Sequence, residues 1–323
     1  MKLKLNEFAA NILRSKVFTV VGAGALAALA GCGDGTGGAA GRGSLQLFIV
    51  PEGSVTEGLT PGTGGENVVD GWTVTYETFV VAFGNFRATR SAAPDDQLSA
   101  PAVTLVDLTH VPTNGLVVAD FSDVSAARWD RVGFDLPNAT GSAAAAEGLA
   151  PEDRERMVSQ GYSLLVRGRI DKPTGQSCNP KDATVCVPAK TIAFEFALAA
   201  GTSFDDCAPS EGDAGFSVPA GGSAQVKPTI HGDHWFFNNV TQGAELTERR
   251  AQWLADCDLD NDGRVDLAEL AKTKASDVFR APTYNVSGGM VPLEFVADWV
   301  ELQARTIGDF QGDGECPTRK AIP

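Results

Sequence analysis

The sequence has few of the side chains that most catalytic sites need, since it contains only three histidines, three tyrosines and three methionines. It lacks the G-x-S-x-G motif of many serine hydrolases and any glycine-rich phosphate loop that follows a strand. Basic residues are also in deficit, with 26 Lys and Arg against 41 Asp and Glu and a formal net charge of −15. Such an acidic chain is repelled by nucleic acid. We therefore recognise no catalytic constellation and expect no nucleic-acid partner.

The N-terminal apolar run, residues 17–30, is too short to span a bilayer comfortably, and it follows a basic leader. It ends in LAGC at residues 29–32, which resembles the lipobox of bacterial lipoproteins. The resemblance implies a signal peptide at residues 1–31, acylation of Cys32 and, because Gly33 follows, anchoring at the outer membrane. An ordinary secretory signal or a transmembrane anchor is the alternative. The Gly-rich residues 32–43 are expected to form a flexible tether.

Paired C-x-x-C spacings are missing, so the cysteines fit no common zinc cluster. An exported chain with five cysteines beyond residue 32 is expected to hold two disulfides and one free thiol. Cys178 and Cys186 bracket a polar loop and are candidates for one bridge, for which Cys207 competes. Cys257 and Cys316 are candidates for the other, which would fasten the C-terminus to the segment before residue 258.

The densest group of carboxylates lies at residues 258–269, with the sequence DLDNDGRVDLAE. Carboxylates this close repel one another unless a hard cation lies among them, and calcium prefers oxygen ligands. The segment resembles an EF-hand loop of the calmodulin type, in which the glycine at position 6 permits the sharp turn. An acidic surface turn is the alternative. The expected calcium ligands are the side chains of Asp258, Asp260, Asp262, Asp266 and Glu269 and the backbone carbonyl of Arg264.

The flanking segments favour the helix-loop-helix form of this loop. Apolar residues recur at helical spacing in residues 244–257, and an outgoing helix is expected from Leu267 to near Ser276. A second acidic stretch, residues 309–316, begins like a calcium loop after an apolar-periodic helix at residues 293–305. Its position 12 is Lys320, which cannot chelate. We therefore expect it to be a structural mate that pairs with the first loop near Val265.

Between the tether and the 258–269 loop, apolar and polar residues alternate over short segments separated by Pro, Gly, Asn and Asp. The second of these segments is long enough for two strands or for one strand bent near Gly84. Successive strands without crossover helices predict a mainly β chain. We expect an antiparallel β-sandwich at residues 44–237, followed by a small α-helical, EF-hand-like region at residues 241–323. The candidate strands are residues 44–50, 72–90, 103–108, 116–121, 129–136, 162–170, 191–199 and 223–237.

Two of the three histidines lie in the segment TIHGDHWFF, residues 229–237. Imidazole and carboxylate groups bind zinc or copper, so His231, Asp233 and His234 are a possible second metal site. In a regular strand, residue 234 would face away from residues 231 and 233, but a bulge at Gly232 can redirect it. Histidines with a purely structural role are the alternative, and His110 joins the site only if the fold brings it near.

Residues 43–200 resemble an uncharacterised domain of bacterial surface lipoproteins, on the runs GSLQLFIV (43–50), TYETFVVAF (75–83), VDL (106–108) and WDRVGF (129–134). The resemblance implies a β-sandwich and no chemistry. The sequence thus predicts a lipid-anchored, calcium-binding protein of the outer membrane. It would serve as a binding or structural module for a protein or glycan partner. The alternative is a transition-metal-handling or enzymatic lipoprotein that uses the two neighbouring histidines.

Overall fold

The computed structural model describes residues 41–240, 247–287 and 292–320. The predicted signal peptide, residues 1–31, lies outside the described residues, and so does Cys32. Within the described ranges, no helix is both long enough and apolar enough to cross a membrane.

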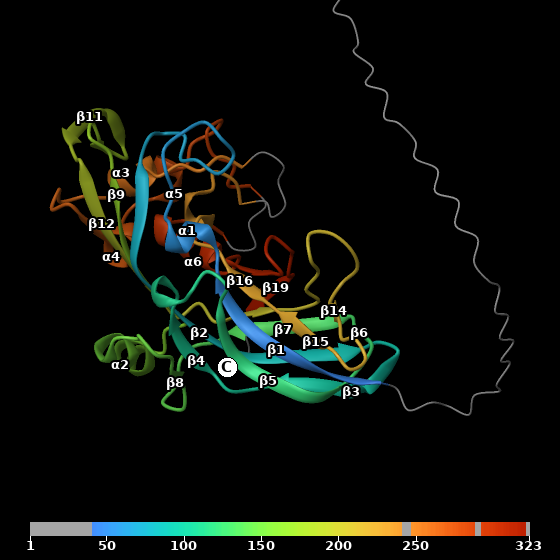
Figure 1. The fold of residues 1–323 in the computed structure, drawn as a ribbon. Helices are drawn as coiled ribbons and strands as arrows, with labels where there is room; N and C mark the ends of the chain where they lie inside the picture. Colours follow the sequence, from blue (N-terminus) through green and yellow to red (C-terminus); the bar gives the residue numbers. More distant parts are fainter. Residues whose placement is uncertain (1–40, 241–246, 288–291, 321–323) are drawn as a thin grey trace, which may run out of the picture. The chain divides into compact units, whose positions relative to one another are not determined.

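The described chain is mainly β, as predicted, with few and short helices (Figure 1). The strands are β1 (Arg42–Pro51), β2 (Thr73–Arg90), β3 (Ala93–Ala100), β4 (Thr104–Asp107), β5 (Leu116–Ser125), β6 (Arg128–Trp129), β7 (Arg131–Leu136), β8 (Ala144–Ala145), β9 (Leu164–Asp171), β10 (Gln176–Asn179), β11 (Asp182–Pro188), β12 (Thr191–Leu198), β13 (Thr202–Phe204), β14 (Phe216–Ser217), β15 (Ser223–Val226), β16 (Pro228–Ile230), β17 (Arg264–Asp266), β18 (Gly308–Phe310) and β19 (Thr318–Lys320). The helices are α1 (Gly53–Thr56), α2 (Pro151–Gln160), α3 (Gln252–Asp256), α4 (Leu267–Leu270), α5 (Ala275–Val278) and α6 (Val296–Ala304), with 3-10 turns η1 (Leu108–His110) and η2 (His234–Phe236).

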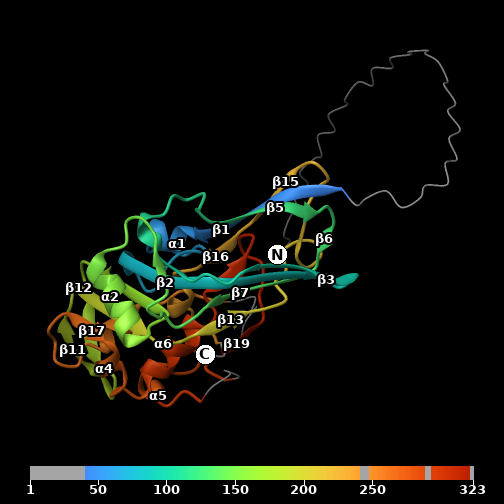
Figure 2. The ribbon, with the colours of Figure 1, turned by 90° about the horizontal axis from the view of Figure 1, so that it is seen from below.

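One sheet is built around β1. Its strand order is β15-β1-β16-β18, and β5 also pairs with β1. The views in Figures 1 and 2 both place β1, β5 and β15 side by side. Strand β1 pairs antiparallel with β5 and parallel with β15 and β16. Its alternating residues Leu45, Leu47 and Ile49 are all buried, which is the pattern expected of a strand with one face on the core.

The second sheet is organised by the long strand β2 and follows the order β17-β12-β9-β2-β7-β13-β19. The first part of β2 pairs with β9 and β4, and the part after Gly84 pairs with β7 and β3. The register shifts between Gly84 and Arg87, and Asn85 adopts a positive φ of 51°. A single irregular strand, one of the two alternatives open from the sequence, therefore connects both halves of the sheet.

One apolar core contains residues from both the strands and the C-terminal helices. All five tryptophans are fully buried. Trp235 packs on Phe79 of β2, whereas Phe279 packs on both Trp253 and Trp299. Loss of one such side chain typically costs about 3–5 kcal/mol, so this aromatic packing stabilises the β and helical parts together.

The helices around the 258–269 loop are shorter than the sequence predicted. Of residues 247–257, only α3 is helical, because Arg249 forms β-bridges with Val68 and Phe237 instead of a helical turn. The Asp70 carboxylate then accepts hydrogen bonds from the backbone N–H groups of Ala251 and Gln252, both at 2.9 Å, and caps the start of α3. The outgoing helix α4 ends at Leu270 rather than near Ser276.

The C-terminal segment contributes strands to sheets that earlier residues build. Strand β17 pairs parallel with β12, β18 pairs antiparallel with β16, and β19 pairs antiparallel with β13. The predicted helix at residues 293–305 is present as α6. The Asp298 carboxylate, in the first turn of α6, caps the helix by accepting the backbone N–H of Phe295 at 2.8 Å.

The structure holds two disulfides, Cys178–Cys186 and Cys207–Cys316, and leaves Cys257 as a free, buried thiol. The expected count and the first bridge are confirmed. The predicted Cys257–Cys316 bridge is wrong, because the C-terminal segment pairs with β13, next to Cys207, and Cys257 points into the core at the end of α3.

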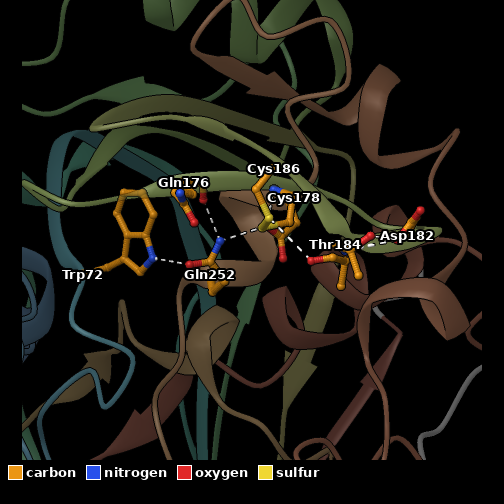
Figure 3. Close-up of a disulfide and its surroundings, with 9 residues drawn as sticks. Trp72, Gln176, Cys178, Asp182, Thr184, Cys186 and Gln252 are labelled. Atoms are coloured by element: carbon orange, nitrogen blue, oxygen red, sulfur yellow. Dashed lines mark hydrogen bonds between the residues drawn. A yellow bond between two sulfur atoms is a disulfide. The ribbon is translucent and has the colours of Figure 1, made fainter.

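The cross-linked hairpin of β10 and β11 rests on α3 (Figure 3). The side chain of Gln252 accepts a hydrogen bond from Trp72 Nε1 at 3.1 Å and donates one to the Gln176 carbonyl at 2.7 Å. The Cys178–Cys186 bridge lies at this end of the hairpin. Because α3 leads directly into the 258–269 loop, the hairpin supports the incoming side of that loop.

Candidate functional site

The 258–269 loop gathers its first three carboxylates. One oxygen atom each of Asp258, Asp260 and Asp262 lies within 4.8 Å of the others. Asp258 is only 5% exposed, and its two oxygens accept the backbone N–H groups of Asp262 at 3.1 Å and Gly263 at 3.0 Å. Gly263 has a φ of +81°, a conformation that glycine adopts without the steric penalty of a Cβ. The local turn therefore brings the three carboxylates toward one another.

The end of the loop folds back on its beginning. Asp266 caps α4 by accepting the backbone N–H groups of Ala268 and Glu269. The Glu269 side chain then accepts the backbone N–H of Leu259 at 3.1 Å. Position 12 of the loop thus closes on position 2, and Arg264 keeps an exposed side chain.

Two loop carboxylates, Asp258 and Glu269, have a raised pKa. Burial raises the pKa of Asp258, and the charges of Asp262 and Asp260 raise it further, against two backbone hydrogen bonds that lower it. Burial likewise raises the pKa of Glu269, with Asp260 and Asp258 adding to the effect. A bound cation removes this mutual repulsion, and an all-oxygen donor set suits a hard ion such as calcium.

The middle of the loop attaches to the large sheet. Val265 in β17 pairs with Phe194 in β12 and is 1% exposed. The backbone N–H of Ala193 donates to the Gly263 carbonyl at 2.9 Å. The expected pairing of Val265 with the 309–316 stretch is therefore wrong, since β12 already occupies that edge and Asp309 lies in β18 beside β16.

Comparisons with known protein families, curated proteins and solved structures find no match to this chain.

The second candidate site lies where β16 ends. The chain leaves the strand at Ile230 and turns at Gly232 into η2, so the expected continuous strand with a bulge does not form. Ser54 Oγ accepts the Gly232 N–H at 2.8 Å, and Tyr76 donates its hydroxyl to the Gly232 carbonyl. A Cβ on residue 232 would lie 2.8 Å from the Tyr76 ring, so glycine is required there.

This turn places His231, Asp233 and His234 on one cavity of about 560 Å³. The two imidazole rings lie 5.3 Å apart between centroids, and one donor atom from each of the three side chains lies within 4.8 Å of the others. His110 takes no part, because it is exposed and its ring lies 3.2 Å from Asp107 in its own turn. The rest of the lining carries more acidic than basic residues, with Glu52, Glu66, Asp309, Asp313 and Glu315 against Arg249.

Arg249 holds Asp233 in place, a contact that the sequence did not indicate. Asp233 is 2% exposed, and its Oδ2 accepts hydrogen bonds from Nε of Arg249, at 2.7 Å, and from Nη2. Arg249 also pairs with Glu66 at 2.6 Å and lies over the Phe237 ring. Burial opposes the charge on Asp233, but the neighbouring His231, His234 and Arg249 together hold its pKa below the usual range.

His231 lies between two carboxylates. Its Nδ1 is 3.8 Å from Asp233 Oδ1 and its Nε2 is 3.2 Å from Asp309 Oδ2. Burial opposes protonation, but these two partners outweigh it and raise the pKa of His231 to about 9. Burial raises the pKa of Asp309 to about 7 despite the attraction of His231. Burial also lowers the pKa of His234 to about 4, so its imidazole is neutral at pH 7.

Proposed function

We propose that this chain is a lipid-anchored, calcium-binding protein of the cell envelope that acts as a binding or structural module. The observation that carries the proposal is the 258–269 loop, in which three carboxylates converge and Glu269 closes on Leu259. The chain's excess of acidic residues favours cations over nucleic acid as partners. A protein or a glycan is the expected macromolecular partner.

The side chains of Asp258, Asp260 and Asp262 would coordinate calcium with the Arg264 carbonyl, while Glu269 would contribute both of its oxygens. Asp266 would bind directly or through a water molecule. Because β17 belongs to both the loop and the large sheet, the ion would fasten the loop to the edge strand β12. We therefore propose that calcium stabilises the folded protein.

Calcium is expected to raise the free energy of unfolding by about 2.7 kcal/mol at a hundredfold excess over Kd, because it binds only the folded loop. Glu269→Gln is expected to lose most of this gain, since it weakens the ligand that closes the coordination sphere. Arg264→Ala is the matched control and should respond as the wild type does, because only its backbone oxygen is used. Chemical unfolding in calcium and in chelator measures all three proteins.

Calcium sites of extracellular modules often have a Kd on the order of 0.1–1 mM, so the unfolding series must extend to several millimolar. Magnesium should replace calcium poorly, because it prefers a smaller octahedral shell. An equal response of Glu269→Gln and wild type to calcium would contradict the assignment of this ligand.

The proposed anchor is Cys32, on the strength of the LAGC sequence at residues 29–32. An acylated N-terminal cysteine that carries more than one chain provides stable membrane attachment, here at the outer membrane. Replacing Cys32 with alanine is expected to abolish incorporation of a fatty-acid analogue during metabolic labelling. Label retained by the Cys32→Ala chain would refute the lipid anchor, whereas Cys257→Ala should incorporate as much label as the wild type.

A further inference from the structure

The cavity at the end of β16 has the donor atoms of a transition-metal site. Two imidazoles and one carboxylate converge there, from His231, His234 and Asp233. Asp233 Oδ1 is buried and has no hydrogen-bond partner among the described residues, although the other oxygen of the same carboxylate is fully engaged by Arg249. A buried carboxylate oxygen without a partner costs free energy, and a cation bound between it and the neighbouring histidines would remove that cost.

The hydrogen bonds of Thr306 determine which nitrogen of His234 is available. Thr306 Oγ1 donates its one hydrogen to the Gln303 carbonyl at 2.9 Å. In this arrangement it accepts the hydrogen bond that links it to His234 Nδ1 at 2.8 Å. The proton of His234 thus resides on Nδ1, which leaves the Nε2 lone pair free to bind a metal.

His231 has a corresponding arrangement. Its Nε2 lies 3.2 Å from the Asp309 carboxylate, while Nδ1 faces Asp233 Oδ1 at 3.8 Å. With the proton on Nε2, the Nδ1 lone pair is available to a metal ion shared with the unpaired Asp233 oxygen, since the donor atoms of the three side chains lie within 4.8 Å of one another. The second polar atoms of Asp233 and His234 are hydrogen-bonded to Arg249 and Thr306, whereas His231 Nε2 lies beside the Asp309 carboxylate as an ion-pair contact without a hydrogen bond. Such outer-shell contacts are typical of metal-binding side chains.

We propose that His231 Nδ1, Asp233 Oδ1 and His234 Nε2 bind a divalent transition-metal ion of the zinc class, with the fourth coordination position open to the cavity. Zinc binds nitrogen and oxygen at about 2.0–2.2 Å, which requires ligand atoms about 3.3 Å apart, so small side-chain rotations from the observed separations suffice. Imidazole ligands favour zinc over calcium. The site is independent of the 258–269 loop and of the function proposed for that loop.

The charges around the cavity suit a dication. Arg249 carries the nearest fixed positive charge, but Asp233 and Glu66 both pair with it. Glu52 and Asp309 also line the cavity. The competing account is a metal-free network in which a protonated His231 bridges Asp233 and Asp309.

Zinc titration of the detergent-solubilised full-length chain by calorimetry separates the two accounts. We expect one zinc ion per chain, with affinity reduced at least roughly 100-fold by His231→Ala or by His234→Ala, since loss of even an outer-shell partner costs about 10–100-fold. Thr306→Val should weaken zinc binding by roughly tenfold. His110→Ala is the matched control, because this exposed histidine lies in a different turn, and it should bind as the wild type does.

A measurement on the wild type protects the test against variants that fail to fold. The chain has three histidines, so long-range proton–nitrogen NMR resolves each ring. Added zinc should shift the ring nitrogens of His231 and His234 and leave His110 unchanged. Lack of zinc binding, or shifts confined to His110, would overturn the proposal in favour of the metal-free network. Glu269→Gln, which alters the proposed calcium loop, should leave zinc binding unchanged. The zinc proposal and the calcium proposal can therefore fail separately.

Discussion

Removal of the Cys207–Cys316 disulfide is expected to lower the free energy of unfolding by about 4–5 kcal/mol. The bridge joins residues 109 positions apart, and in the chain-entropy account a loop of about 100 residues restricts the unfolded state by about 4.7 kcal/mol. The bridge also fixes the C-terminal segment, since the Ala208 N–H donates to the Glu315 carbonyl at 2.9 Å beside it. Cys207→Ala with Cys316→Ala is the variant to compare, because both positions are buried and serine would add an unsatisfied hydroxyl.

The matched control is the Cys178→Ala and Cys186→Ala pair. That bridge spans only eight positions and should cost about 2–3 kcal/mol on the same account. Urea unfolding of the two double variants and the wild type, under non-reducing conditions, measures the difference. If the Cys207/Cys316 variant is at least as stable as the Cys178/Cys186 variant, the prediction is wrong, and the longer bridge does not stabilise the protein more than the shorter one.

The second large effect is expected from Arg249→Met, which should lower the free energy of unfolding by about 3–5 kcal/mol. The substitution keeps much of the side-chain volume over Phe237 but leaves Asp233 charged, buried and without its guanidinium partner. Urea unfolding measures the loss. The pair of Arg131 and Asp206 is the control, since both side chains are more than half exposed and Arg131→Met should cost at most about 1 kcal/mol.

A double variant identifies the cause of this loss. With Asp233→Asn added, no buried charge remains unpaired, so part of the stability lost in Arg249→Met should return. If the double variant is less stable than Arg249→Met by the full cost of Asp233→Asn alone, the two residues act independently and the ion-pair account is wrong.

Features carried by contiguous residues were predictable from the sequence. Asp258, Asp260 and Asp262 converge because they alternate within one short turn, and the Cys178–Cys186 bridge joins two strands of one hairpin. The alternation at Leu45, Leu47 and Ile49 likewise identifies a strand without knowledge of its neighbours. In each case the backbone geometry of a short segment already determines which side chains come together.

Contacts between distant residues were not predictable, because they depend on the topology of the sheets. Cys316 meets Cys207 because β19 pairs with β13. Val265 pairs with Phe194 because β17 adds to the edge of β12 that β9 does not cover. His231 meets Asp309 across the β16–β18 ladder, about 80 positions away along the chain. Within residues 247–257, the predicted helix is confined to α3 while Arg249 forms β-bridges, which shows tertiary pairing overriding helical periodicity.

Isothermal titration calorimetry of calcium into the metal-free wild-type chain tests the central claim most directly. The account predicts one calcium ion per chain with a Kd on the order of 1 mM or tighter, and loss of that binding in Glu269→Gln but not in Arg264→Ala. No heat of binding up to about 10 mM calcium, on the order of ten times the weakest expected Kd, would contradict it.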